Sequence, residues 1–189
     1  ACRYRWRDWP KGPDRVDRRT RSGGPLSRLL AIRVISGTSV CRNHRRSAAM
    51  PNGNDGPLLS RTREFWDRNP CDGFPDIRQR MAFRYRKEPW LPPLLERIAH
   101  HGRILEIGCG QGSDSLYTCM HMSPGGLYTA LDLSPASIDS ARRSAAQASG
   151  MLRVYPDFMV GNAERLEFPD GAFSCGVSLG VLHHSPNTQ

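Results

Sequence analysis

The sequence predicts an α/β fold, a Rossmann-like doubly wound parallel sheet with helices on both faces and only the first four strands present. Apolar, strand-like runs alternate with helical patterns between residues 91 and 180. The first run, 104–107, leads into glycine at every second position, Gly108, Gly110 and Gly112. A strand, a glycine turn and a helix in this order let a ligand approach backbone amides and a helix N-terminus.

The elements before and around this turn follow from local signals. A helix is predicted by apolar residues at i, i+3, i+4 and i+7, namely Leu91, Leu94, Leu95 and Ile98. The first strand is predicted over 103–107 and the next helix over about 113–122, where the apolar side chains have helical spacing. A Pro-Gly-Gly turn at 124–126 then leads into a second strand over 127–132.

The later elements complete an alternating pattern. Ser134 is a favourable N-cap and Pro135 a favourable first residue for a helix that runs to Gly150. The third strand is predicted within 153–160 and the fourth within 173–180. Right-handed crossovers between parallel strands then give the local order 3-2-1-4.

Two acids occupy informative places in this pattern. Glu106 lies inside a buried strand, where a carboxylate costs several kcal/mol unless it is paired. Asp132 ends the second strand, where a carboxylate can accept hydrogen bonds from both ribose hydroxyls of a nucleoside. The dinucleotide-binding fingerprint requires a third glycine at the position of Ser113, which argues against a nicotinamide site.

Together, the Glu-x-Gly-x-Gly-x-Gly pattern over 106–112 and the strand-ending acid resemble the class I S-adenosylmethionine-dependent methyltransferases, in particular the type 11 methyltransferase domain. Residues 161–168 look like the family's adenine-binding turn, and 173–184 like its fourth strand with the following loop. The chain departs from the family at Asn162, where Asp is commoner, and at 175–176, where an acid is usual.

The resemblance implies transfer of a methyl group from S-adenosyl-L-methionine to a small-molecule acceptor. It places Glu106 near the amino group of the cofactor, Asn162 near the exocyclic amine of adenine, and the backbone of Ala163 near the ring. It implies that the cofactor-binding residues are Glu106, Gly108, Cys109, Gly110, Gly112, Asp132, Leu133, Asn162, Ala163 and Leu179.

The acceptor side is less defined. His183 and His184 follow the fourth strand and are candidate catalytic bases, although they could instead cap the strand or pack the pocket wall. Phe65 and Trp66 are interpreted either as a lid or as core residues. An Arg-rich stretch is interpreted as a solvated face, with recognition of an acidic substrate as the alternative; its members are Arg80, Arg84 and Arg86.

The balance of charged residues changes near Met50, which could be encoded by the true start codon. Residues 1–50 hold 13 Lys and Arg against 3 Asp and Glu, whereas the remainder holds 14 against 15. We interpret 1–49 as a disordered or non-native leader; a polyanion-binding arm and a transit peptide are the alternatives. Residues 50–87 are assigned to a lid or substrate-side segment, and 88–189 to the cofactor-binding domain.

The sequence also limits the cellular compartments and the binding partners that we expect for the protein. Six scattered cysteines without a C-x-x-C pair favour a reducing cytoplasm and predict no metal site. No apolar run is long enough to span a membrane.

The oligomeric state is left open. The family continues after its fourth strand, so we expect this chain to be a fragment. The rival functions are an NAD-dependent oxidoreductase and a nucleic-acid-binding module that uses the basic leader.

Overall fold

The computed structural model describes residues 56–70 and 73–184, so the basic leader predicted at 1–49 lies outside the described residues. Four strands form one parallel sheet in the order β3-β2-β1-β4. The strands are β1 (Arg103–Ile107), β2 (Leu127–Asp132), β3 (Asp157–Val160) and β4 (Cys175–Val177). This order confirms the predicted α/β class and the predicted strand arrangement.

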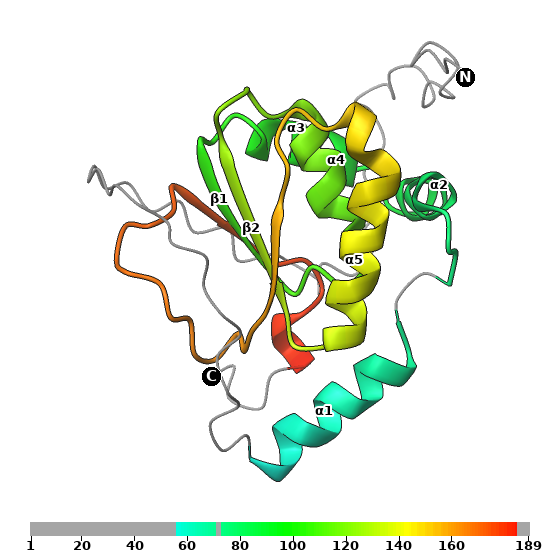
Figure 1. Ribbon diagram of the computed structural model, residues 1–189, viewed down its shortest axis with the longest axis vertical. Coiled ribbons are helices and arrows are strands. Elements are labelled where there is room, and N and C mark those ends of the chain that lie inside the picture. The colour runs from blue at the N-terminus through cyan, green and yellow to red at the C-terminus, as the bar shows by residue number, and fades with distance from the viewer. Residues whose placement is uncertain (1–55, 71–72, 185–189) are drawn as a thin grey trace, which may run out of the picture.

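Five α-helices are described around the sheet (Figure 1). They are α1 (Pro57–Arg68), α2 (Ile77–Lys87), α3 (Leu91–Ile98), α4 (Ser113–His121) and α5 (Pro135–Ala148), with short 3₁₀ turns η2 (Ser149–Met151) and η3 (Leu182–His184). The bounds of β1 and β2 agree with the sequence prediction, and α3 spans the predicted apolar positions but ends at Ile98, before Gly102, where the sequence suggests that it ends. Ser134 caps α5 as predicted, because its side-chain oxygen accepts a hydrogen bond from the Ser137 amide.

The apolar pattern of the sequence did not predict the helices α1 and α2. In α2 the reason is that a charged residue, Arg80, occupies a buried position that an amphipathic pattern reserves for an apolar side chain. The helix begins instead with a strong local signal, since the Asp76 carboxylate accepts hydrogen bonds from the amides of Arg78 and Gln79, both at 3.0 Å.

The core lies between the sheet and one layer of helices. The crossovers from β1 to β2 and from β2 to β3 run in the same direction, so α4 and α5 pack on the same face, and α2 and α3 pack against α4. The side chains of Ile104, Tyr128, Ala130 and Phe158 point into this core. The return segment 161–174 contains no helix. Helices on the second face therefore stay a prediction.

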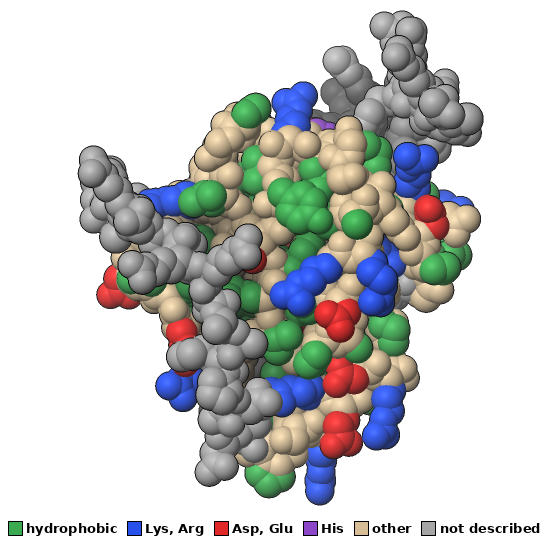
Figure 2. Space-filling view, in the orientation of Figure 1, with side chains coloured by type: hydrophobic (Ala, Val, Ile, Leu, Met, Phe, Trp, Pro, Cys, Tyr) green, Lys and Arg blue, Asp and Glu red, His purple; other side chains and the backbone are tan. Residues whose placement is uncertain are grey.

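On the face shown in Figure 2, basic and acidic side chains are interspersed. One exposed ion pair lies on α5, where Arg142 is 3.6 Å from Asp139. Among the described residues no helix is both long and apolar enough to cross a lipid bilayer.

Gly112 is where the glycine turn meets the core. Its φ of 81° lies in the left-handed region, and a Cβ there would lie 3.0 Å from the Phe158 ring and 3.1 Å from the Ala141 Cβ. The residue therefore permits both the turn and the close packing of α5 and β3 against the start of α4.

Replacement of this glycine tests the packing. We expect Gly112→Ala to lower the free energy of unfolding by about 1–3 kcal/mol, because alanine adds left-handed backbone strain and a crowded methyl group. Urea titration measures the change. Gly150→Ala is the matched control, since Gly150 has open space around its Cα. Equal stabilities of the two variants would contradict this account.

Candidate functional site

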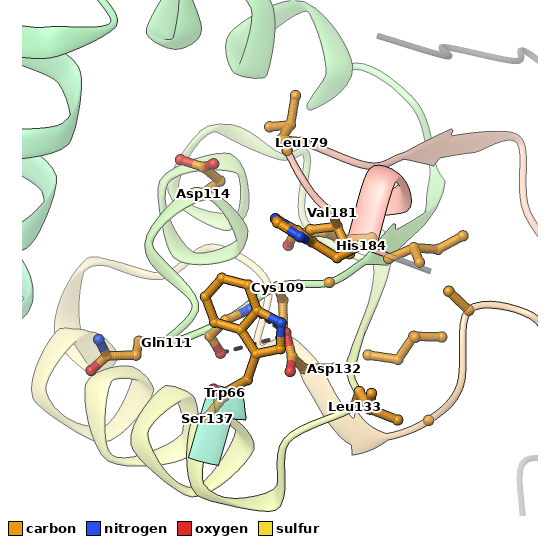
Figure 3. A pocket seen from close by; sticks show the side chains of 18 of the residues that line it. Trp66, Cys109, Gln111, Asp114, Asp132, Leu133, Ser137, Leu179, Val181 and His184 are labelled. Carbon is orange, nitrogen blue, oxygen red and sulfur yellow. Dashed lines mark hydrogen bonds between the residues drawn. The ribbon is translucent and has the colours of Figure 1, made fainter. Parts of the chain in front are cut away.

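A pocket opens at the carboxyl ends of the parallel strands, where the glycine turn, the end of β2 and the loop after β4 meet (Figure 3). Ten of the twelve predicted site residues line it, namely Glu106, Gly108, Cys109, Gly110, Asp132, Leu133, Asn162, Ala163, Leu179 and His184. Gly112 packs against Phe158 and Ala141 in the core. The side chain of His183 lies outside the described part of the structure.

The glycine turn is held by backbone hydrogen bonds to the neighbouring strand. The amides of Gly108 and Cys109 donate to the Leu131 carbonyl oxygen at 2.7 and 3.0 Å. Gly108, Gly110 and Gly112 all have positive φ, and Gly112, the N-cap of α4, makes no side-chain cap. The first turn of α4 therefore begins with a backbone-only cap beside the pocket.

Asp132 fastens this turn to β2 and to the start of α5. One carboxylate oxygen accepts from the Gly110 amide at 2.8 Å, and the other accepts from the Ser134 amide at 2.9 Å. Burial raises the pKa of Asp132, whereas these backbone donors oppose the rise. Each carboxylate oxygen has a further lone pair, so the group can still accept hydrogen bonds from a ligand.

Glu106 is the buried acid of β1. Its side chain accepts hydrogen bonds from the hydroxyls of Ser115 and Tyr128, the latter at 3.0 Å. Burial, together with the nearby negative charge of Asp114, raises its pKa from 4.5 to about 7. Two hydroxyl donors thus satisfy a carboxyl group that titrates near neutral pH.

The turn after β3 forms another wall of the pocket. The Asn162 side-chain oxygen accepts from the Glu164 amide at 2.9 Å, and the Gly161 amide donates to the Asp132 carbonyl oxygen at 2.9 Å. Asn162 therefore closes an Asx turn, and its carbonyl oxygen keeps one lone pair for a second donor.

Two segments near the ends of the described part of the chain, α1 and η3, also line the pocket. The rings of Trp66 and His184 lie 5.1 Å apart in an edge-on arrangement, and both face the pocket (Figure 3). The Asp67 carboxylate accepts from the Ser134 hydroxyl at 2.6 Å, which ties α1 to the start of α5. Trp66 therefore belongs to the pocket wall, and its role as a lid stays a prediction.

The interpretation of the Arg-rich stretch as a solvated face is wrong for two of its three members. Arg80 is buried, and Arg84 forms a two-pronged ion pair with Asp114, with Arg84 Nη2 at 2.6 Å from the carboxylate, whereas Arg86 is exposed. Burial lowers the pKa of Arg84, but the charge and hydrogen bonds of Asp114 outweigh this and raise it. Both residues of the pair line the pocket.

Sequence reasoning did not identify Asp114, Gln111 or Ser137 as pocket residues. A signal existed for Asp114, since an acid in the first turn of a helix that follows a glycine turn faces the strand ends. Among the described residues no group of three or more His, Cys, Asp and Glu side chains could hold a metal ion. Burial, and then the charges of Glu106 and Asp132, raise the pKa of the Cys109 thiol, which keeps it neutral.

Residues 104–189 match the model of a family described as a methyltransferase domain. A probable phthiotriol/phenolphthiotriol dimycocerosates methyltransferase of Mycobacterium ulcerans is 34% identical over 84 residues, which are 44% of this chain and 30% of that protein. A fatty-acid O-methyltransferase of Mycolicibacterium smegmatis is 27% identical over 121 residues, 64% of this chain and 42% of that protein. The chain thus spans less than half the length of these curated relatives.

Solved structures show similar, partial matches. An arsenic(III) S-adenosylmethionine methyltransferase from Chlamydomonas reinhardtii aligns with a TM-score of 0.42 and 27% identity over 46% of this chain and 31% of that chain. An O-methyltransferase from Bacillus cereus, in complex with SAH, aligns with a TM-score of 0.38 and 20% identity over 59% of this chain and 46% of that chain.

The raised pKa of Glu106 predicts a pH-dependent stability. The folded protein binds a proton that the unfolded chain releases, so the free energy of unfolding falls as the pH rises from 4.5 to about 7. The side chain of Glu106→Gln stays neutral at every pH, so its free energy of unfolding does not fall in this way. We therefore expect the difference in unfolding free energy, variant minus wild type, to be up to about 3 kcal/mol larger at about pH 8 than at about pH 4.

Urea titrations at both pH values measure this difference. Glu64→Gln is the control, because the Glu64 side chain is 65% exposed. If Glu106→Gln kept the full pH dependence of the wild type, Glu106 would not be the group that titrates.

Proposed function

Because residues 104–189 match the model of a methyltransferase-domain family, we propose that the protein transfers a methyl group from S-adenosyl-L-methionine to a small-molecule acceptor. The observation that carries the proposal is the convergence of the glycine turn, Asp132 and Asn162 on one pocket. These groups come from the ends of three neighbouring strands, which is where parallel sheets bind nucleosides.

The pocket offers a partner for each part of this cofactor. Asp132 has lone pairs for the ribose hydroxyls, and Asn162 has one for the adenine amine. Glu106 lines the pocket and, in its ionised form, supplies negative charge for the ammonium group at the methionyl end. The positive φ of Gly108 and Gly110 brings the backbone of the turn to the pocket surface without intervening side chains.

The bound cofactor would supply an electrophilic methyl group on a sulfonium. Transfer is an in-line displacement, so the main task of the protein is to align the two reactants and to exclude water. Residues 50–87 serve as the lid and substrate-side segment, and α1 brings Leu59, Thr62 and Trp66 to the pocket. We assign His184, or its neighbour His183, as the base for an oxygen or nitrogen acceptor.

We propose an apolar, lipid-like acceptor. Two observations support it. The relatives named above include enzymes described as acting on fatty acids and on phthiotriol dimycocerosates. On this chain, Phe65 and Trp66 line a second recess together with Arg61, Thr62 and His184, and this recess shares Thr62, Trp66 and His184 with the main pocket. An apolar chain could lie in this recess while its polar end reaches the pocket.

We also propose that the protein works in the cytoplasm. Cys109, Cys119 and Cys175 are free thiols in the described part of the chain, and all three are buried. Unpaired buried thiols suit a reducing compartment.

Ligand-induced melting tests the proposed cofactor. S-adenosylhomocysteine should raise the melting temperature of the protein and NAD should not, since a ligand stabilises the folded state that binds it. Asp132→Ala should weaken the binding of S-adenosylhomocysteine by about 1.5–3 kcal/mol, the range of charge-assisted hydrogen bonds. Asp139→Ala, an exposed acid on α5, is the control. Stabilisation by NAD alone would favour the oxidoreductase alternative.

A second measurement tests the acceptor. In the presence of S-adenosylhomocysteine, we expect Trp66→Ala to weaken the binding of a long-chain fatty acid about tenfold, because it removes a large aromatic contact. Calorimetric titration gives the affinity, and Trp90→Ala, an exposed tryptophan at the start of α3, is the control. Equal fatty-acid affinities of the two variants would rule out a role for α1 in acceptor binding.

A further inference from the structure

Arg80 is a buried arginine that lies directly behind the glycine turn. Its side chain is on α2, and the residue is 1% exposed. Nη1 donates to the Phe74 carbonyl oxygen at 2.8 Å and to Gln111 Oε1 at 3.2 Å, and Nη2 donates to the Gln111 carbonyl oxygen at 3.4 Å. Gln111 lies between two glycines of the turn and lines the pocket.

The same guanidinium reaches two helices as well. Nε donates to the Ser113 hydroxyl at 3.4 Å, at the first residue of α4, and Nη2 donates to the Ser144 hydroxyl on α5. Ser140, one turn before Ser144, donates its hydroxyl to Gln111 Oε1 at 2.8 Å. One rigid, planar group thus sets the positions of the turn, the start of α4 and the middle of α5 relative to one another.

The turn needs an external support of this kind. Gly112 is the N-cap of α4 and gives no side-chain cap, and three residues of the turn have the permissive backbone of glycine. Glycine loses more conformational freedom on ordering than any other residue, so a glycine-rich turn is costly to hold in one shape. The carbonyl and carboxamide oxygens of Gln111, the one long side chain between Gly110 and Gly112, give Arg80 two points of attachment.

We propose that Arg80 is a positioning residue for the cofactor site, which holds the segment from Gln111 to Ser113 in the conformation that binds the cofactor. Arg80 acts through Gln111 and Ser113, which line the pocket. The inference rests on the proposed function, because it assigns the turn to cofactor binding. Burying a guanidinium is expensive, and here the charge satisfies five acceptors on the segments that shape one side of the pocket.

Arg80→Lys is the informative substitution, because lysine keeps the charge but cannot reach these acceptors with a planar fork. We expect the dissociation constant for S-adenosylhomocysteine to rise at least about tenfold, equivalent to 1.4 kcal/mol. Hydrogen exchange should also become faster for the amides of 110–115 in the free variant, while the amides of β1 and β2 keep their wild-type protection. Arg80→Met should lower affinity further.

Two controls separate positioning from general stability. Arg86→Lys changes an exposed arginine on the same helix and should leave affinity within about twofold of the wild type. Tyr85→Phe removes a different link between α2 and α4, the hydrogen bonds of the Tyr85 hydroxyl to the Ser113 carbonyl oxygen at 3.2 Å and to Asp114 at 3.1 Å. If Arg80 had a purely structural role, the loss of affinity for a given loss of melting temperature would be the same in Tyr85→Phe and Arg80→Lys. A positioning role predicts a larger loss of affinity in Arg80→Lys.

The outcomes distinguish the inference from the function on which it rests. If the wild type binds S-adenosylhomocysteine and Arg80→Lys binds it equally well, with unchanged exchange at 110–115, the positioning role is overturned and the proposed function stands. If the wild type does not bind S-adenosylhomocysteine, both are overturned. An Arg80→Met variant that fails to fold leaves the decision to Arg80→Lys, whose loss of affinity without loss of melting temperature supports the inference.

Discussion

The carboxylate of Asp132 joins three segments at one point. Its two oxygens accept from the amides of Gly110 and Ser134, and the Ser134 hydroxyl in turn donates to Asp67 on α1. The glycine turn, the cap of α5 and the position of α1 therefore depend on a single strand-ending side chain. Such a group does two jobs at once, because the oxygens that organise the backbone are also those that face the pocket.

A second support comes from the opposite side of the turn. The helix α2 directs Arg80, Arg84 and Tyr85 towards residues 111–114, and this polar layer adds to the apolar contacts that Ile77 and Met81 of the same helix make in the core. Buried polar layers require complete hydrogen bonding, which favours one arrangement over many. The pocket is thereby built against a wall that holds its shape through directional bonds.

Sequence patterns predicted the elements whose signals are local. The position of α3 follows from its apolar spacing, the end of β1 from the glycines after it, and the start of α5 from Ser134. The strand-ending acid and the glycine turn likewise located the pocket. The role of Arg80 could not be predicted, because its partners Gln111 and Ser144 are 31 and 64 residues away and an arginine ordinarily indicates an exposed position. Long-range polar contacts of this kind produce no periodic spacing of residue types that could be recognised in the sequence.

The contact between Gly108 and Val181 has a consequence for how such a pocket can diversify. A Cβ at position 108 would lie 2.3 Å from the methyl groups of Val181, so the loop after β4 rests directly on the backbone of the first glycine. Variation in substrate preference cannot enter through position 108 without displacing that loop. It can enter through position 181, where a smaller side chain would deepen the cavity while the backbone of the glycine turn stays in place. Evolution and protein engineering therefore have one tunable side of this contact and one fixed side.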